Sequence, residues 1–143
     1  MGALLQNNYD IAINLGKLLH EHNGGDVIVM DMRPLDFWTD YFVIVTATSN
    51  THMSGLERHI KEFVRSSDLE IYHRSSRLKS DIEVSSNRSD STELGPNEWS
   101  LLDLGGIVIH LMTSKSRSFY ELERLWSNAP LIFKGEAHSS KSS

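Results

Sequence analysis

The sequence contains no cysteine, only three prolines and no long apolar run. Disulfides, thiolate nucleophiles and cysteine-based zinc sites are therefore excluded. No stretch approaches the roughly 20 apolar residues that a membrane-spanning helix needs. The first residues also lack the basic segment and apolar run of a signal peptide. We expect a cytoplasmic protein with no membrane partner.

Basic residues are also scarce. Lys and Arg number 14 against 19 Asp and Glu, which gives a net charge of −5. A dedicated nucleic-acid-binding domain usually carries a basic excess, so that class is disfavoured, whereas docking to a basic protein stays open. The densest basic cluster is interrupted by serines and is interpreted as a solvated loop, with an RNA contact as the alternative. It consists of His73, Arg74, Arg77 and Lys79.

Helical and extended patterns alternate along the chain, and 143 residues favour a single core. Hydrophobic periodicity predicts helices over 4–22, 51–66 and 115–126. Apolar runs predict strands over 26–32, 39–47 and 69–73, and on both sides of Gly105-Gly106. The run 39–47 is apolar on both faces, as in a central strand. The order α-β-β-α-β-β-β-α predicts an α/β fold with a single mixed sheet and packing helices.

Two segments are expected to lie outside this packed unit. Residues 74–98 are rich in Ser, Asn and charged side chains, which predicts a long mobile loop with at most a short strand near 81–84. Residues 134–143 are predicted to be a disordered Ser/Lys tail. The folded domain is therefore expected to span residues 1–133.

The most informative segment is a predicted hairpin around Gly105-Gly106. A two-residue Gly-Gly connection suits a type I′ turn, in which both central residues have positive φ. The pairing that follows from this turn gives one aliphatic face, expected to be core, and one mixed face. The mixed face carries Trp99, Leu101, Asp103, Val108, His110 and Met112. It is interpreted as a second buried layer, a catalytic pocket or a docking surface, and in the last case Trp99→Ala should weaken binding without unfolding the domain.

Two groups of residues permit a catalytic or metal-binding interpretation, and each also has a structural one. Ser49 and His52, with Asp40 nearby, permit a hydrolase triad, but no Gly-x-Ser-x-Gly elbow is present and helix capping is favoured. Asp103 and His110 lie diagonally across the hairpin, where a structural pair is favoured over a two-ligand metal site. No metal site is predicted.

A metal-dependent nucleotidyltransferase is the alternative enzyme hypothesis. It would use Asp31 and Asp40, because two-metal chemistry needs converging carboxylates. Position 33 is arginine, however, where an Asp-x-Asp pair would place its second acid, and no Gly-rich phosphate loop is present. No cofactor and no small-molecule substrate are predicted.

The predicted helix 115–126 is unusually rich in aromatic side chains. Phe119, Leu122 and Trp126 share one face at helical spacing, and a core stripe is favoured for Phe119 and Leu122. Arg117 and Glu121 form an i,i+4 pair in the same pattern. Tyr120 is not explained by this account.

Four segments together resemble the ribosome silencing factor family, also called the Iojap family. They are Thr39-Asp40-Tyr41-Phe42-Val43-Ile44; Ser49 with His52; Trp99-x-Leu-x-Asp103-x-Gly105 through His110; and Arg117-x-Phe119-Tyr120-x-Leu122-Glu123-x-Leu125-Trp126-x-x-Ala129-Pro130. Their order and spacing match over roughly residues 5–133. The chain departs from the family where no Glu-Gly precedes the tryptophan and where Leu104 stands in place of an aromatic residue.

The resemblance implies a nucleotidyltransferase-like fold without enzymatic activity. It implies a translational repressor that binds the large ribosomal subunit through universal protein number fourteen of that subunit and sterically blocks joining of the small subunit. For the loop 74–98, two alternatives stay open: a minor contact with ribosomal RNA, or exposure to solvent without a partner. The docking residues carried over from the family are Trp99, Leu101, Leu102, Asp103 and Leu104.

Overall fold

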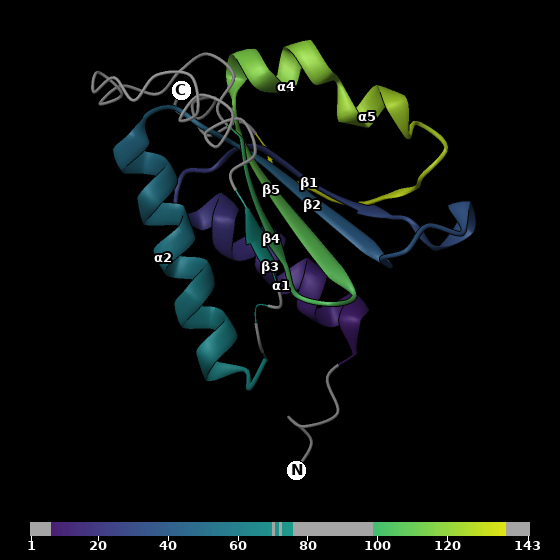
Figure 1. The fold of residues 1–143 in the computed structure, drawn as a ribbon, viewed down its shortest axis with the longest axis horizontal. Helices are drawn as coiled ribbons and strands as arrows, with labels where there is room; N and C mark the ends of the chain where they lie inside the picture. The colour runs from purple at the N-terminus through teal and green to yellow at the C-terminus, as the bar shows by residue number, and fades with distance from the viewer. Residues whose placement is uncertain (1–6, 70, 72, 76–98, 137–143) are drawn as a thin grey trace.

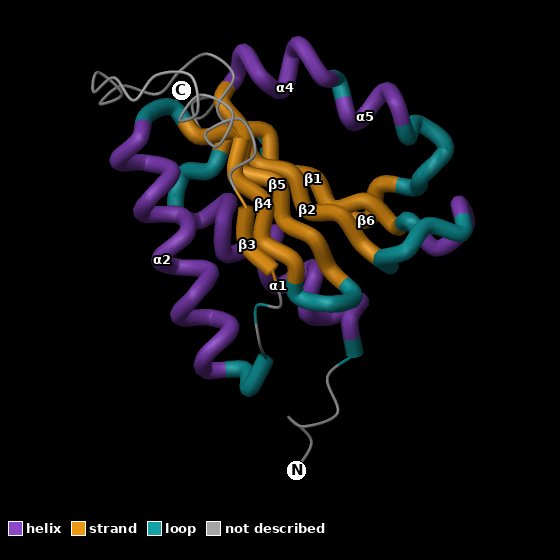
Figure 2. Tube along the Cα trace, in the orientation of Figure 1, coloured by secondary structure: helices purple, strands orange, loops and turns teal. Residues whose placement is uncertain are grey.

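A computed structural model describes residues 7–69, 71, 73–75 and 99–136, which form one mixed sheet with helices on both faces (Figure 1). The six strands lie in the order β3-β4-β5-β2-β1-β6 (Figure 2). The helices are α1 (Asn8–Glu21), the 3-10 turn η2 (Arg33–Leu35), α2 (Asn50–Ser66), α4 (Ser114–Tyr120) and α5 (Leu122–Leu125). The strands are β1 (Gly25–Asp31), β2 (Tyr41–Ala47), β3 (His73–Ser75), β4 (Trp99–Asp103), β5 (Ile107–Thr113) and β6 (Leu131–Lys134). The predicted mixed α/β class is confirmed, because β2 pairs in parallel with β5 and the other neighbours are antiparallel.

Strand β2 is a central strand covered on both sides, as its sequence predicts. Val43 and Val45 enter the layer beneath α1 and α2, whereas Phe42 and Ile44 enter the layer on the α4–α5 side. In Figure 1 the two long helices lie on one side of the sheet, and α4 and α5 lie on the other. The domain therefore has two apolar layers with the sheet between them.

Side-chain caps set where the first two long helices begin. Asn7 accepts a hydrogen bond from the Asp10 N–H and caps α1, which begins at Asn8; residues 4–6 of the predicted helix lie outside the described part. Ser49 caps α2 in the same way, as predicted, by accepting from the His52 N–H at 3.0 Å. These two caps thus fix the N-terminal ends of α1 and α2.

The predicted third helix is broken in two at Glu121. This residue has a left-handed backbone, with φ of 48°, and separates α4 from α5. The break turns Leu122 into the core, as predicted, but leaves Phe119 74% exposed, so the predicted burial of Phe119 is wrong. The predicted Arg117–Glu121 pair is wrong as well, because Arg117 pairs with Glu123 and Glu121 pairs with Arg124.

Both ends of the sheet differ from the sequence-based expectation. Strand β3 begins at His73, so the strand predicted over 69–73 is misplaced. The sixth strand, β6, was not predicted, and it pairs antiparallel with β1. Lys134 belongs to β6, so the predicted tail cannot begin there. The tail over 137–143 and most of the predicted loop 74–98, including the strand near 81–84, lie outside the described residues.

The hairpin has the predicted register but another turn. Trp99 pairs with Met112, Leu101 with His110 and Asp103 with Val108. Of the two turn glycines, Gly105 has a positive φ of 99° and Gly106 does not. This is the pattern of a type II′ turn and not of type I′. The Asp103 carboxylate accepts from the Gly105 N–H at 2.8 Å and stabilises the turn.

The connection from α1 to β1 has no room for a side chain at Gly24. A Cβ there would lie 2.5 Å from Val45 Cγ2 and 2.8 Å from the Leu19 carbonyl oxygen. We expect Gly24→Ala to lower the free energy of unfolding by about 1–3 kcal/mol, measured by urea denaturation. The matched control is Gly55→Ala on α2, where the nearest atom is 3.8 Å away and helix propensity predicts a neutral or stabilising change. Equal losses in both variants would contradict this account.

Candidate docking face

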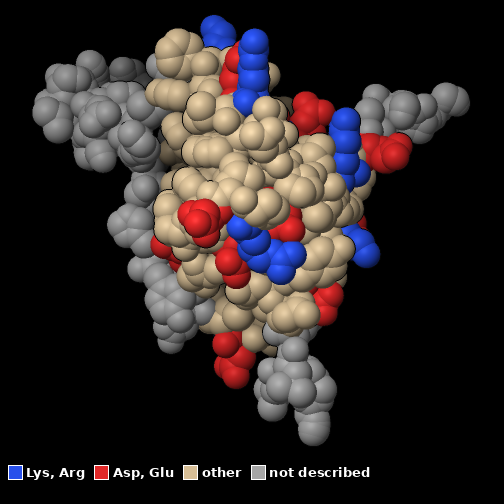
Figure 3. Space-filling view, turned by 90° about the vertical axis from the view of Figure 1, so that its right-hand side faces the viewer, with Lys and Arg blue, Asp and Glu red and all other residues tan. Residues whose placement is uncertain are grey.

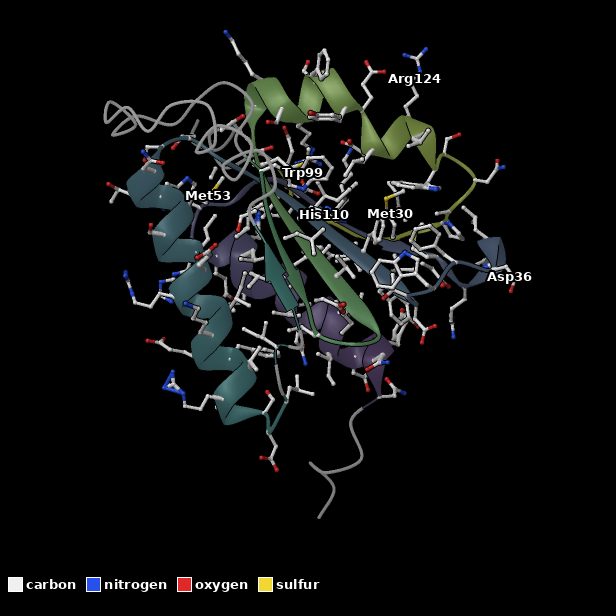
Figure 4. The ribbon with its side chains drawn as sticks, in the orientation of Figure 1. Met30, Asp36, Met53, Trp99, His110 and Arg124 are labelled. Carbon is white, nitrogen blue, oxygen red and sulfur yellow. The ribbon has the colours of Figure 1, made fainter. Side chains whose placement is uncertain are left out.

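The mixed face of the hairpin is a second buried layer at its centre. Trp99 is 9% exposed, and its indole N–H donates to His110 Nδ1 at 3.1 Å. Figure 4 shows the two side chains lying together between the sheet and α4. This burial argues against the expectation that Trp99 can be truncated without affecting the fold, because the side chain belongs to the core.

The accepted hydrogen bond also fixes the state of His110. Because Nδ1 accepts from Trp99, the neutral ring carries its proton on Nε2, which is buried without a hydrogen-bond partner among the described residues. Burial lowers the pKa of His110 to about 3. The predicted Asp103–His110 pair is not formed, since Asp103 is engaged by the turn and His110 by Trp99.

Four side chains of β4 and α4 lie on the same side of the sheet as this buried pair, and we call them the hairpin face. Its members are Leu101, Asp103, Phe119 and Tyr120. Leu101 and Asp103 are half-buried on the mixed side of β4. The Tyr120 ring lies 4.9 Å from the Trp99 ring and 4.9 Å from that of Phe119, so exposed and buried aromatic rings form one continuous stack of contacts. The buried Trp99 thus supports the aromatic part of the hairpin face, Tyr120 and Phe119, from below.

The predicted docking residues divide by burial. Leu101 and Asp103 contribute to the surface, whereas Leu102 is fully buried and Leu104 is 7% exposed. Leu102 and Leu104 pack in the layer beneath α1 and α2, on the opposite side of the sheet. Phe119 and Tyr120 were not predicted as surface residues, because an unbroken helix would place Phe119 on the same buried face as Leu122.

Helix α4 is held in place by a buried arginine. Arg117 donates to Thr46 Oγ1 at 2.9 Å, to the Gly25 carbonyl oxygen at 3.3 Å and to Glu123 Oε2 at 3.0 Å. These contacts tie α4 and α5 to the ends of β1 and β2. An open hollow of about 420 Å³ lies beside Arg117 and is lined by side chains of both charge signs. The contacts of Arg117 explain how Phe119 and Tyr120 are held over the hairpin.

The residues of the alternative enzyme hypothesis do not form an open metal site. Both Asp31 oxygens accept from the Arg33 guanidinium, each at 2.9 Å. This hydrogen-bonded guanidinium holds the pKa of the Asp31 carboxyl below its usual value, against the opposing effect of burial. Asp31 is therefore engaged in an ion pair with Arg33. It is not available to join Asp40 in binding a metal ion.

The residues of the alternative hydrolase triad form the capping contacts that the sequence favours. His52 Nδ1 accepts from the Thr48 N–H at 3.0 Å, and the Ser49 hydroxyl caps α2. His59 of α2 stacks on His22, the C-cap residue of α1, with ring centroids 3.6 Å apart. Among residues 7–69, 71, 73–75 and 99–136, no three His, Asp or Glu side chains are placed to hold a metal ion. In the same part of the chain, no helix is long and apolar enough to cross a membrane.

Fold and surface together define a mixed-sheet α/β protein with an aromatic surface beside a buried tryptophan. The family described as "Ribosomal silencing factor during starvation" matches residues 6–143. The chain belongs to this ribosomal silencing factor (Iojap) family. The ribosomal silencing factor of Treponema pallidum is 31% identical over 72% of this chain and 78% of its own length.

Other relatives are longer proteins. The chloroplast Iojap protein of Arabidopsis thaliana is 31% identical over 85% of this chain and 43% of its own length. A mouse protein named for mitochondrial assembly of the ribosomal large subunit is 31% identical over 79% of this chain and 43% of its own length. This chain thus spans less than half of these two relatives. Because relatives are named for chloroplasts and mitochondria, a cytoplasmic location stays a prediction.

A solved structure shows the same fold. The crystal structure of a protein from Chromobacterium violaceum superposes with a TM-score of 0.67 at 20% sequence identity, covering 85% of this chain and 88% of the other. At this sequence identity, the similarity shows a shared fold and nothing about function.

Proposed function

We propose that the chain is a translational repressor that binds the large ribosomal subunit and sterically blocks joining of the small subunit. Its partner is universal protein number fourteen of the large subunit, and it acts by occupying a surface, without catalysis. Membership of the silencing-factor family supports the proposal, as does the mouse relative named for large-subunit assembly.

The hairpin face is the observation that carries the proposal. Phe119 is 74% exposed and touches Tyr120, which lies against the buried Trp99. An exposed aromatic side chain held on a rigid support is typical of the residues that dominate protein interfaces. We propose that Phe119, Tyr120, Leu101 and Asp103 contact the partner directly. Trp99, Leu102 and Leu104 act from beneath by fixing the position of the hairpin.

Sedimentation of the full chain with isolated large subunits tests the proposal. We expect Phe119→Ser to reduce binding at least tenfold, since truncation of an interface aromatic costs about 2 kcal/mol. The fold should be unchanged, because the side chain lies largely in solvent. Tyr9→Ser is the matched control: Tyr9 is an exposed aromatic residue, and it lies on α1, across the sheet.

A subunit-joining assay separates binding from function. The unchanged chain should lower the fraction of joined ribosomes in a mixture of the two subunits, and Phe119→Ser should restore joining. Binding to purified protein fourteen tests the partner. Binding of the unchanged chain to joined ribosomes as tightly as to large subunits would overturn the steric mechanism, and equal sedimentation of Phe119→Ser and Tyr9→Ser would exclude the hairpin face.

A further inference from the structure

A second exposed aromatic surface lies at the other end of the same sheet face. We call it the Trp38 patch and define it by Phe37, Trp38 and Trp126. Trp38 is 64% exposed, and its ring centroid lies 5.6 Å from that of Phe37. Phe37 is in turn 5.4 Å from Trp126 and 5.4 Å from Phe42 of β2. The patch is therefore anchored in the core and is not a loosely attached side chain.

Two exposed leucines flank the Trp38 patch. Leu125 is 65% exposed and precedes Trp126, and Leu131 of β6 is 52% exposed and pairs with Met30. Figure 3, which faces this side of the molecule, shows a broad uncharged area between charged groups at its top and lower centre. Such a concentration of exposed apolar side chains is typical of an interaction site.

The charges beside Trp38 indicate what kind of partner fits. Asp36 and Asp40 flank it in the same loop, and within the described residues neither carboxylate forms an ion pair. The nearby Arg33 is already engaged by Asp31. The loop thus carries an exposed aromatic ring and, on either side of it in sequence, a carboxylate that forms no contact ion pair among the described residues, although Arg33 attracts Asp40 electrostatically. A tryptophan face and carboxylates together favour Lys or Arg side chains.

The same charges disfavour two other occupants. The phosphates of RNA would meet Asp36 and Asp40 without compensation. A second copy of this chain would bring the same carboxylates together across a symmetric interface, between molecules that each carry a net charge of −5. A basic protein surface with aliphatic side chains satisfies both the apolar area and the charge.

We propose that the Trp38 patch is a second docking surface, which binds a basic, aliphatic-rich protein segment of the particle that the hairpin face engages. This inference rests on the proposed function for the identity of the particle. The Trp38 patch and the hairpin face share one face of the sheet. Ring contacts through Phe42 and His110 link them, with centroids 4.5 Å apart. Two anchors at a distance on one rigid face set the orientation of the bound protein.

The first test is sedimentation of full-length variants with isolated large subunits at several salt concentrations. We expect Trp38→Ser to weaken binding about tenfold or more and Trp38→Phe to retain most of it, because an aromatic ring remains. Asp36→Asn should weaken binding several-fold at low salt and flatten the salt dependence. Asn tolerates the left-handed backbone of this position, where φ is 60°, so the fold is kept. Tyr9→Ser again serves as the control.

Photo-crosslinking identifies the occupant. A benzoylphenylalanine in place of Trp38, irradiated on large subunits, should crosslink to a Lys- or Arg-rich segment of a ribosomal protein. Crosslinks to RNA or to a second copy would overturn the inference, as would full binding by Trp38→Ser. Any of these contradicting results would leave the proposed function intact if Phe119→Ser still reduces binding to large subunits at least tenfold. Failure of the unchanged chain to sediment with large subunits overturns both proposals.

Discussion

Trp99→Ala is expected to destabilise the domain by about 3–5 kcal/mol, the range found when a buried aromatic side chain is truncated. The indole is 9% exposed and packs with Met112 and Leu122 in the layer beneath α4 and α5. Its removal also leaves His110 Nδ1 without the donor that it has at 3.1 Å. A buried acceptor that loses its partner adds to the cost of the cavity.

Urea denaturation followed by circular dichroism measures this loss. Trp99→Phe is the informative comparison, because it keeps most of the ring but removes the N–H, and it should cost clearly less than Trp99→Ala. Loss of large-subunit binding by Trp99→Ala must be measured under conditions in which the variant is folded. A variant as stable as the parent would show that the indole does not support the core.

The second large effect concerns acid stability and originates in His110. The folded protein holds the pKa of His110 at about 3, whereas an unfolded histidine has a pKa of about 6.5. Between these values the unfolded chain binds a proton that the folded protein does not. The contribution to stability is therefore complete above pH 6.5 and is lost as the pH falls toward 3, by up to about 1.4 kcal/mol per pH unit.

His110→Gln isolates this contribution. Gln retains an oxygen that can accept from the Trp99 N–H but does not titrate. Between pH 6.5 and 4.5 we expect the parent to lose about 2 kcal/mol more unfolding free energy than the variant, measured by urea denaturation at each pH. Carboxylates contribute to both proteins and cancel in the difference. Parallel loss of stability in the two proteins would show that His110 is protonated in the folded state.

Much of the fold is predictable from the sequence because its strongest signals are local. The apolar run in β2 predicts a strand buried on both faces, and Ser49 predicts the start of α2. The register of β4 and β5 follows from the short connection at Gly105, although the turn type does not. In each case a few neighbouring residues determine the outcome.

The features that the sequence did not predict, such as the break at Glu121 and the burial of Trp99, depend on contacts between segments that are distant in sequence. Glu121 adopts a left-handed backbone although its type does not favour that conformation, and Arg117 binds Gly25 and Thr46, which are remote in sequence. The resulting break exposes Phe119. Burial of Trp99 likewise depends on α4, which packs over it from the C-terminal segment. Local periodicity cannot report either effect, so the sequence identified the hairpin as important but not which of its residues reach solvent.

The pairing of β6 with β1 has a consequence for how the chain is made. Residues 131–134 complete the sheet beside residues 28–30, which leave the site of synthesis about a hundred residues earlier. Until the last strand arrives, the edge of β1 presents unpaired backbone groups, and it can recruit a strand from another molecule. A nascent chain that stalls before residue 131 therefore leaves β1 as an unpaired edge strand that can associate with other chains. Closure of this edge of the sheet therefore depends on residues 131–134.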